Sequence, residues 1–259
     1  MSRASSKNPL RGWYVISLRP LGEHGGVRRS ARKFGAVVFA LSTLRLQPLD
    51  ARVALREALR CPRIVVSSPA AARFAGAQLK LVARRGQRWY AQGPGTKAVL
   101  QRSGIGGVRT PAAGFDSEAL LMDSELVQVR GESIGLITAP GGRGLLDAGL
   151  RERGARVLRA EVYRRQTMPL AAARRRALAA LPARSALLLS SGEALAVLWQ
   201  ALDAPGRAQL IQRPCVVASA RLAAQARALG FTRLLHADNA QPPSLLKALS
   251  DHVGGPGFR

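Results

Sequence analysis

The sequence predicts an α/β fold of two flavodoxin-like, doubly wound parallel-sheet domains joined by a two-stranded linker. Three observations carry this prediction: apolar runs alternate with helical stretches, segments recur in the same order, and two extended stretches end at a proline. The chain has 259 residues, of which 47% are hydrophobic. It is therefore long enough for two modest domains that each bury a core.

Short apolar runs mark the strands. In the first half of the chain they are Trp13–Leu18, Ala36–Leu41, Arg63–Val66 and Trp89–Gln92. The intervening stretches have helical spacing, as in Phe74, Ala77, Gln78 and Leu81. Continuous apolar runs are typical of buried parallel strands, and their alternation with helices predicts βαβ units. Ligand-binding turns are then expected at the carboxyl ends of the strands.

The chain also repeats itself after about 120 residues. The matched segments, in order, are 14–38 with 135–157, 64–69 with 187–192, 93–104 with 218–230, and 116–121 with 243–246. Four matches in the same order indicate two copies of one ancestral unit.

Two stretches break this rhythm. Phe39–Pro48 and Glu161–Pro169 each alternate in polarity and then meet a proline, which cannot donate a hydrogen bond within a sheet. We interpret both as extended strands that cross between the two domains, so that the domain boundary is a pair of strands.

Several turns at predicted strand ends suit an anionic ligand. Ser67-Ser68 and Ser190-Ser191 each follow a strand and open a helix, where hydroxyls and free N–H groups bind anions; plain N-capping is the alternative. Gly93-Pro-Gly-Thr96 allows a close backbone approach, and Thr96 is expected to cap the next helix. In Ala139–Arg143, Arg143 either forks onto a carboxylate or is a solvated surface arginine.

Tyr163 is the notable titratable residue, because it stands in a crossing strand beside Arg164 and Arg165. Neighbouring positive charge lowers a phenol pKa, so Tyr163 is a candidate proton donor; a half-buried strand tyrosine is the alternative. The sequence has no GxSxG, HExxH or kinase motif. Its three histidines and two cysteines are scattered, which argues against a metal site or a disulfide framework.

The charge balance is strongly basic. Lysine and arginine number 40 against 15 acidic residues, which gives a formal net charge of +25 and attracts anions. A nucleic-acid partner is one interpretation, and a compositional bias of a GC-rich genome is the other. Against a nucleic-acid partner, aromatic residues are only 5% of the chain and no basic stripe is concentrated. We find no signal peptide and no membrane-spanning run, so a cytoplasmic location is expected.

These motifs, taken in order, resemble the uroporphyrinogen-III synthase family from Trp13 to Leu249. The matching segments are Arg19-Pro20, Ser67-Ser68-Pro69, Gly93-Pro94-Gly95-Thr96, Asp116-Ser117-Glu118, Gly141-Gly142-Arg143, Val162-Tyr163-Arg164 and Ser190-Ser191. The resemblance implies a first domain of residues 1–38 and 168–259 and a second domain of residues 43–160. Residues 39–42 and 161–167 are then the crossing linkers.

The resemblance further implies a monomeric, cofactor-free enzyme that converts hydroxymethylbilane into uroporphyrinogen III, with loss of water and inversion of the D ring through a spiro intermediate. Tyr163 matches the tyrosine suspected of assisting hydroxyl loss. The expected substrate-binding residues are Arg19, Ser67, Ser68, Gly93, Thr96, Arg143, Ser191 and Ser219. The chain departs from the family at Ala218–Arg221, where a glycine and a threonine are lost and Arg221 adds a charge.

Two other functions compete with this one. The first is a two-domain small-molecule binding protein without catalysis, which also has two α/β domains and crossing strands. The second is a basic nucleic-acid-binding protein, which a steep salt dependence of binding identifies.

Overall fold

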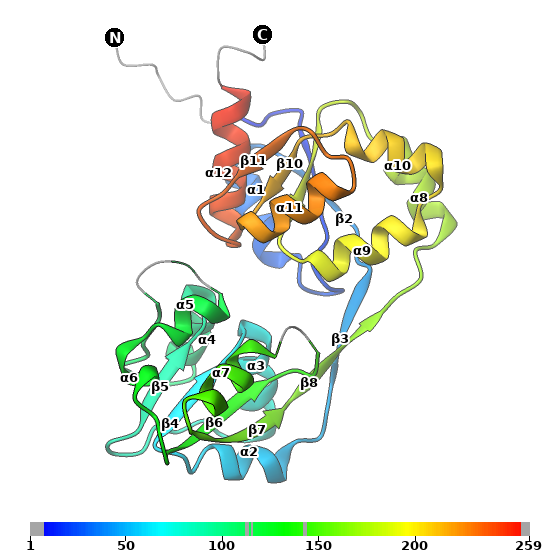
Figure 1. Ribbon diagram of the computed structural model, residues 1–259. Coiled ribbons are helices and arrows are strands. Elements are labelled where there is room, and N and C mark those ends of the chain that lie inside the picture. The colour runs from blue at the N-terminus through cyan, green and yellow to red at the C-terminus, as the bar shows by residue number, and fades with distance from the viewer. Residues whose placement is uncertain (1–7, 112–113, 115, 142–143, 255–259) are drawn as a thin grey trace, which may run out of the picture. The chain divides into compact units, whose positions relative to one another are not determined.

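The computed structural model describes residues 8–111, 114, 116–141 and 144–254 (Figure 1). The chain divides into two compact units, the first formed by Met1–Arg45 with Gln166–Arg259 and the second by Leu46–Arg165. Each unit has its own parallel sheet, and one pair of strands carries the chain from the first unit to the second and back.

The first unit contains a five-stranded parallel sheet in the order β11-β10-β9-β1-β2. Its strands are β1 (Tyr14–Ser17), β2 (Val37–Ala40), β9 (Ser185–Leu189), β10 (Cys215–Val217) and β11 (Leu234–His236). Its helices within the described residues are α1 (Gly25–Phe34), α8 (Ala172–Ala179), α9 (Gly192–Ala201), α10 (Ala204–Ile211), α11 (Ala220–Ala228) and α12 (Pro242–Val253).

Side chains on alternate strand positions pack on opposite faces of this sheet. In β1, Val15 packs in a cluster with α1 and α12, whereas Ile16 packs in a cluster with helices α8 to α11. In β9, Leu188 joins the first cluster and Leu187 the second. The sheet is therefore doubly wound, as the continuous apolar runs predict.

The second unit contains a four-stranded parallel sheet in the order β5-β4-β6-β7, and an isolated bridge from Tyr90 to Arg109 lies beyond β5. Its strands are β4 (Arg63–Val66), β5 (Arg88–Ala91), β6 (Ser133–Thr138) and β7 (Arg156–Glu161). The helices α2 (Arg52–Ala58), α3 (Pro69–Gln78) and α4 (Pro94–Arg102) contribute to one apolar cluster. The helices α5 (Ser117–Leu121), α6 (Ser124–Val127) and α7 (Leu145–Glu152) contribute to the other.

One glycine of this sheet has no room for a side chain. A Cβ built on Gly135 in β6 lies 2.2 Å from the carbonyl oxygen of Ala58, at the end of α2. The helix therefore approaches the strand more closely than any other residue type allows.

The strands β3 (Leu44–Pro48) and β8 (Tyr163–Thr167) form the two-stranded antiparallel sheet that joins the units. Backbone hydrogen bonds flank it, from Leu49 N to the Val162 oxygen (3.1 Å) and from Met168 N to the Thr43 oxygen (2.8 Å). The prediction of a two-stranded linker is confirmed.

Residues 39–42, expected in the crossing segment, begin as the end of β2. Phe39 and Ala40 pair with Ile16 and Ser17 of β1, and the buried Leu41 belongs to the core of the first unit. Because burial of Leu41 holds this stretch in the first unit, the crossing strand starts only at Leu44.

The two sheets correspond strand by strand through the sequence repeat. The matched segments include β1 and β6, the starts of β2 and β7, and β4 and β9, and the third match begins just after β5 and β10. The order β10-β9-β1-β2 in the first unit therefore equals the order β5-β4-β6-β7 in the second. Each unit is built from the first half of one copy and the second half of the other.

Candidate active site

The Ser67-Ser68 turn follows β4 at the carboxyl edge of the second sheet. Ser68 is the N-cap of α3: its extended backbone precedes Pro69, and its Oγ accepts a hydrogen bond from Ala71 N at 3.0 Å. Proline at the first helical position is pre-organised for a helix and lacks an N–H that would go unpaired. N-capping, one of the two interpretations of this serine, therefore holds in the structure.

Tyr163 is the first residue of β8, just after the chain leaves β7. Its hydroxyl oxygen lies 3.1 Å from the Ser68 Oγ. Its ring stacks on Phe74 of α3, with centroids 5.2 Å apart and planes inclined by 17°. The side chain is buried, with 5% of the residue exposed. Helix α3 therefore holds both the hydroxyl and the ring of the predicted proton donor.

A second pair of hydroxyl groups forms a hydrogen bond at the ends of two neighbouring strands. Ser67 Oγ donates to Thr138 Oγ1 at 2.9 Å, and Thr138 is the last residue of β6. Strands β4 and β6 are adjacent, and the helices that follow them, α3 and α7, belong to different apolar clusters. This is a topological switch point, where ligands of open α/β sheets bind. Thr138 thus joins the polar residues at this edge, although no motif in the sequence predicted its contact with Ser67.

The turn after β6 is described only in part. Arg165 of β8 donates from Nη2 to the Pro140 oxygen at 3.4 Å, and Gly141 adopts a left-handed φ of +77°. Arg143, predicted to bind a carboxylate, lies outside the described residues.

The Gly93–Thr96 turn follows β5 at the same edge. Gly93 is the N-cap of α4, and Pro94 is its first residue. The expectation that Thr96 caps this helix is wrong, because Pro94 starts the helix two residues earlier. Thr96 is instead buried inside the first turn, where its N–H donates to the Gly93 oxygen at 3.0 Å.

The remaining predicted residues belong to the first unit, at the carboxyl ends of its strands. Arg19 follows β1 and donates from Nη2 to the Ala240 oxygen at 2.5 Å. Burial lowers the pKa of the Arg19 guanidinium, and the charge of Glu23 opposes this shift. Ser191 caps α9 through Ala194 N at 3.3 Å. Ser219 caps α11 through Leu222 N at 3.4 Å.

His24 also lies at this edge of the first sheet. The sequence pattern did not predict it, because the three histidines are scattered along the chain. It is 4% exposed, and its ring nitrogens lie 2.9 Å from Ser17 Oγ and 2.8 Å from Ser42 Oγ. Burial, followed by the charges of Arg28, Arg19 and Arg174, lowers the pKa of His24 to about 4. The ring is therefore neutral at pH 7, with one nitrogen donating and the other accepting, and it ties the end of β1 to the turn after β2.

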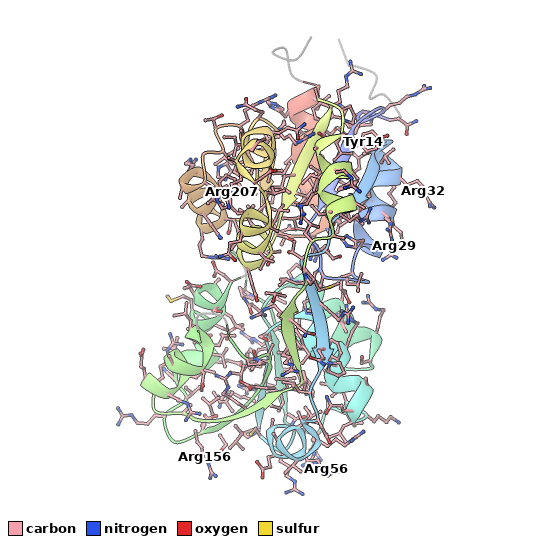
Figure 2. The ribbon with its side chains drawn as sticks, turned by 90° about the vertical axis from the view of Figure 1, so that its right-hand side faces the viewer. Tyr14, Arg29, Arg32, Arg56, Arg156 and Arg207 are labelled. Carbon is pink, nitrogen blue, oxygen red and sulfur yellow. The ribbon has the colours of Figure 1, made fainter. Side chains whose placement is uncertain are left out.

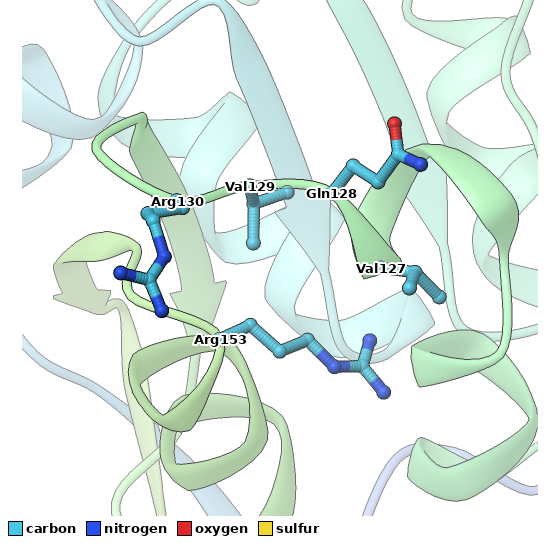
Figure 3. A pocket seen from close by; sticks show the side chains of 5 residues that line it. All are labelled: Val127, Gln128, Val129, Arg130 and Arg153. Atoms are coloured by element: carbon cyan, nitrogen blue, oxygen red, sulfur yellow. The ribbon is translucent and has the colours of Figure 1, made fainter.

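A surface hollow of about 370 Å³ lies elsewhere in the second unit (Figure 3). It is lined by Val127, Gln128, Val129, Arg130 and Arg153. These residues precede β6 and β7, so the hollow is at the amino edge of the second sheet, opposite the edge that carries Ser67 and Gly93. The Arg153 guanidinium already donates to the carbonyl oxygens of Leu121 and Leu126.

Many basic side chains point into solvent. Figure 2 shows Arg29 and Arg32 of α1 in the first unit, and Arg56 of α2 and Arg156 of β7 in the second, extending outward. Arginines are thus spread over both units. In the described part of the chain no group of three or more His, Cys, Asp or Glu side chains suits a metal ion. The helices found there are too short or too polar to span a bilayer.

These features define a two-domain α/β protein with serine hydroxyls and one buried tyrosine at the carboxyl ends of its strands. The family model described as uroporphyrinogen-III synthase HemD matches residues 27–247. The chain therefore belongs to the uroporphyrinogen-III synthase family, hydro-lyases of porphyrin and tetrapyrrole biosynthesis.

Individual relatives agree with this assignment. The chain is 34% identical to the uroporphyrinogen-III synthase of Salmonella typhimurium over 180 residues, which are 68% of this chain and 73% of that protein. It is also 34% identical to the Escherichia coli enzyme over 134 residues, which are 51% of this chain and 54% of that protein.

Solved structures share the fold. A mutant uroporphyrinogen III synthase of Thermus thermophilus has a TM-score of 0.60 at 18% identity. The uroporphyrinogen-III synthetase of Helicobacter pylori has a TM-score of 0.61 at 13% identity. Each comparison covers 93% of this chain and 98% of the other.

Proposed function

We propose that this chain cyclises hydroxymethylbilane to uroporphyrinogen III, and that Tyr163 assists the departure of the substrate hydroxyl. The C–O bond breaks, the hydroxyl takes up a proton and leaves as water, and the D ring inverts through a spiro intermediate before the macrocycle closes. No electrons enter or leave the substrate, so the proposal includes no redox cofactor. An electron-rich pyrrole expels the hydroxyl readily, and positioning supplies most of the rate gain.

The contact between Tyr163 and Ser68 is the observation that carries this proposal. Ser68 Oγ already accepts the Ala71 N–H, so its own O–H is available to the Tyr163 oxygen 3.1 Å away. In that arrangement the phenol O–H is left to donate to the leaving hydroxyl. A phenol aligned in this way is a general acid, which contributes typically 10²–10⁴-fold to a rate.

The carboxylates of the substrate need cationic and hydrogen-bonding partners. We assign this role to Arg19, Ser191 and Ser219 in the first unit and to Ser67, Gly93, Thr96 and Arg143 in the second. Arginine forks and exposed backbone N–H groups at helix starts favour carboxylates. Most of the other arginines are then a compositional feature with no part in the reaction.

The decisive experiment is an isomer assay. Purified protein is incubated with hydroxymethylbilane, and the products are oxidised and separated by chromatography. The expected product is the type III isomer. Appearance of the spontaneously formed type I isomer alone contradicts the proposal, and binding without turnover favours the alternative of a small-molecule binding protein.

A further inference from the structure

Gln78, the last residue of α3, makes several hydrogen bonds beside the strand that carries Tyr163. Its Nε2 donates to the carbonyl oxygens of Leu49 at 3.0 Å and of Val162 at 3.4 Å. Its Oε1 accepts from Ala51 N at 2.9 Å. One amide side chain therefore joins the end of α3 to Ala51 at the start of α2 and to Leu49 and Val162, the residues that follow β3 and precede β8.

Val162 is the residue at which the chain leaves the four-stranded sheet. Its N–H still donates to the Thr138 oxygen at 3.0 Å, as a strand residue does, while its carbonyl accepts from Leu49 N at 3.1 Å in the next ladder. Its side chain is fully buried. The direction in which Tyr163 emerges is set at this junction, and Gln78 is the side chain that binds it.

Helix α3 thus contacts Tyr163 at two points along its length and the residue before it at a third. Ser68 at its start contacts the hydroxyl, Phe74 in its second turn stacks on the ring, and Gln78 at its end binds the backbone of the preceding residue. Phe74 and Gln78 are four residues apart and share one face of the helix. A single rigid element therefore fixes where the phenol oxygen lies.

We propose that Gln78 is a positioning residue for Tyr163, an inference that rests on the proposed function. Gln78 acts by holding the Val162 carbonyl and hence the start of β8. A displacement of about 1 Å at a reacting group costs on the order of 100-fold in rate. Loss of this tether is therefore expected to lower kcat and to leave KM nearly unchanged, because the phenol acts on the leaving hydroxyl and not on the carboxylates.

Gln87 provides a matched control in the same unit. Its Nε2 donates to the carbonyl oxygens of Leu59 at 2.9 Å and Cys61 at 2.8 Å, and its Oε1 accepts from Arg84 N at 3.2 Å. It is partly buried like Gln78, but it precedes β5 at the amino edge of the sheet. Loss of its hydrogen bonds perturbs the fold without touching the tyrosine.

The test compares Gln78→Met, which keeps the shape and removes the hydrogen bonds, with Gln87→Met. Gln78→Glu, which keeps only the acceptor, is a second variant in case the first fails to fold. Both Gln78 variants are expected to lower kcat about tenfold with KM within about twofold of wild type, a smaller loss than the roughly 100-fold of a full displacement. Gln87→Met is expected to keep the wild-type kcat, although its denaturation midpoint falls by an amount comparable to that of Gln78→Met.

A double mutant separates positioning from general damage. When Tyr163 is already phenylalanine, Gln78→Met is expected to cause no further loss of kcat, because the hydroxyl it positions is gone. An equal loss in both backgrounds, or an unchanged kcat in the single variant, overturns the role of Gln78 while the proposed function stands. If the wild-type protein forms no type III isomer, the proposed function is wrong. If Tyr163→Phe has full activity, the role of Tyr163 is wrong, and the role of Gln78 with it.

Discussion

The hydroxyl oxygen of Tyr163 lies 3.1 Å from the Oγ of Ser68, although 95 positions separate them in the sequence. The strands that lead to these residues, β7 and β4, are not neighbours, because β6 lies between them. The contact forms because the chain turns from β7 into β8 across the carboxyl edge of the sheet. The same serine caps α3, so the helix start and the phenol are coupled.

Tyr163→Phe removes the phenol oxygen and keeps the ring that stacks on Phe74. We expect the rate of type III isomer formation to fall by about 100-fold if the phenol is the general acid. The free energy of unfolding should fall by only about 1 kcal/mol, the usual value of one hydrogen bond. Stopped assays with chromatographic isomer separation and urea titration measure the two quantities.

Tyr90→Phe is the control for this substitution. The Tyr90 hydroxyl donates to Glu125 at 2.5 Å in the same unit, within the cluster that contains α5, α6 and α7. This variant should lose at least as much stability, because hydrogen bonds to charged groups contribute about 1.5–3 kcal/mol, and it should keep full activity. Equal activity of the Tyr163 and Tyr90 variants contradicts the role of Tyr163.

Ser68→Ala removes the N-cap of α3 and the partner of the phenol together. We expect a loss of about 1 kcal/mol of stability and a fall in kcat. The cap variant Asp203→Ala, which deletes the acceptor for Gly206 N at the start of α10, should cost similar stability with unchanged kcat. Thermal unfolding and steady-state kinetics of both variants measure these two effects. An unchanged kcat in Ser68→Ala means that Ser68 only caps α3 and has no effect on the reaction.

Arg19→Gln tests whether one arginine of the first unit binds substrate carboxylates. Charge-assisted hydrogen bonds contribute about 1.5–3 kcal/mol each, so KM should rise roughly tenfold or more with a smaller effect on kcat. Arg29→Gln removes an equal charge from the exposed face of α1 and should leave KM unchanged. The same rise of KM in both variants indicates a diffuse field effect, and steady-state kinetics at two salt concentrations distinguishes the two cases.

His24 makes stability depend on pH. Its pKa is about 4 in the folded protein against an ordinary value of 6.5, so the unfolded chain binds the proton more readily. Its contribution is complete above pH 6.5 and is lost as the pH falls toward 4, by at most about 3 kcal/mol. We expect His24→Gln to flatten this part of the pH profile of unfolding free energy, measured by urea titration.

The exposed His236 is the control for the pH experiment. Its substitution by glutamine should leave the profile parallel to that of wild type. Parallel profiles for His24→Gln and wild type between pH 6.5 and 4 contradict the assignment of the low pKa to His24.

Local sequence patterns predicted the strands well where consecutive residues are all buried. The runs at 13–18, 36–41, 63–66 and 89–92 became β1, β2, β4 and β5 within one residue at each end, because strands covered on both faces must be apolar throughout. The start of the crossing strand was predicted less well. Phe39 and Ala40 pair with β1 in the first sheet, since the same apolar alternation suits a sheet and a linker.

The candidate site was predictable only in part. Tyr163 and Ser68 could be singled out by residue type and by their place at strand ends. Phe74 and Gln78 looked like ordinary residues of a helix face, and nothing local shows that this face meets a strand more than 80 residues later. The same reason explains why Thr138, Ser17, Ser42 and His24 were missed, because single hydrogen bonds between distant residues leave no periodic signal.

The sequence by itself determined that two copies of one βαβ pattern follow each other, because apolar periodicity and turn chemistry are local properties. Only the tertiary structure decided how the copies combine. Each copy breaks between its second and third strands, and β1-β2 pairs with β9-β10 while β4-β5 pairs with β6-β7. Backbone hydrogen bonds between parallel strands are the same whichever copy of the repeat a strand belongs to. Side-chain packing on the sheet faces therefore selects which strands pair. That exchange creates the crossing strands and brings Tyr163 to α3.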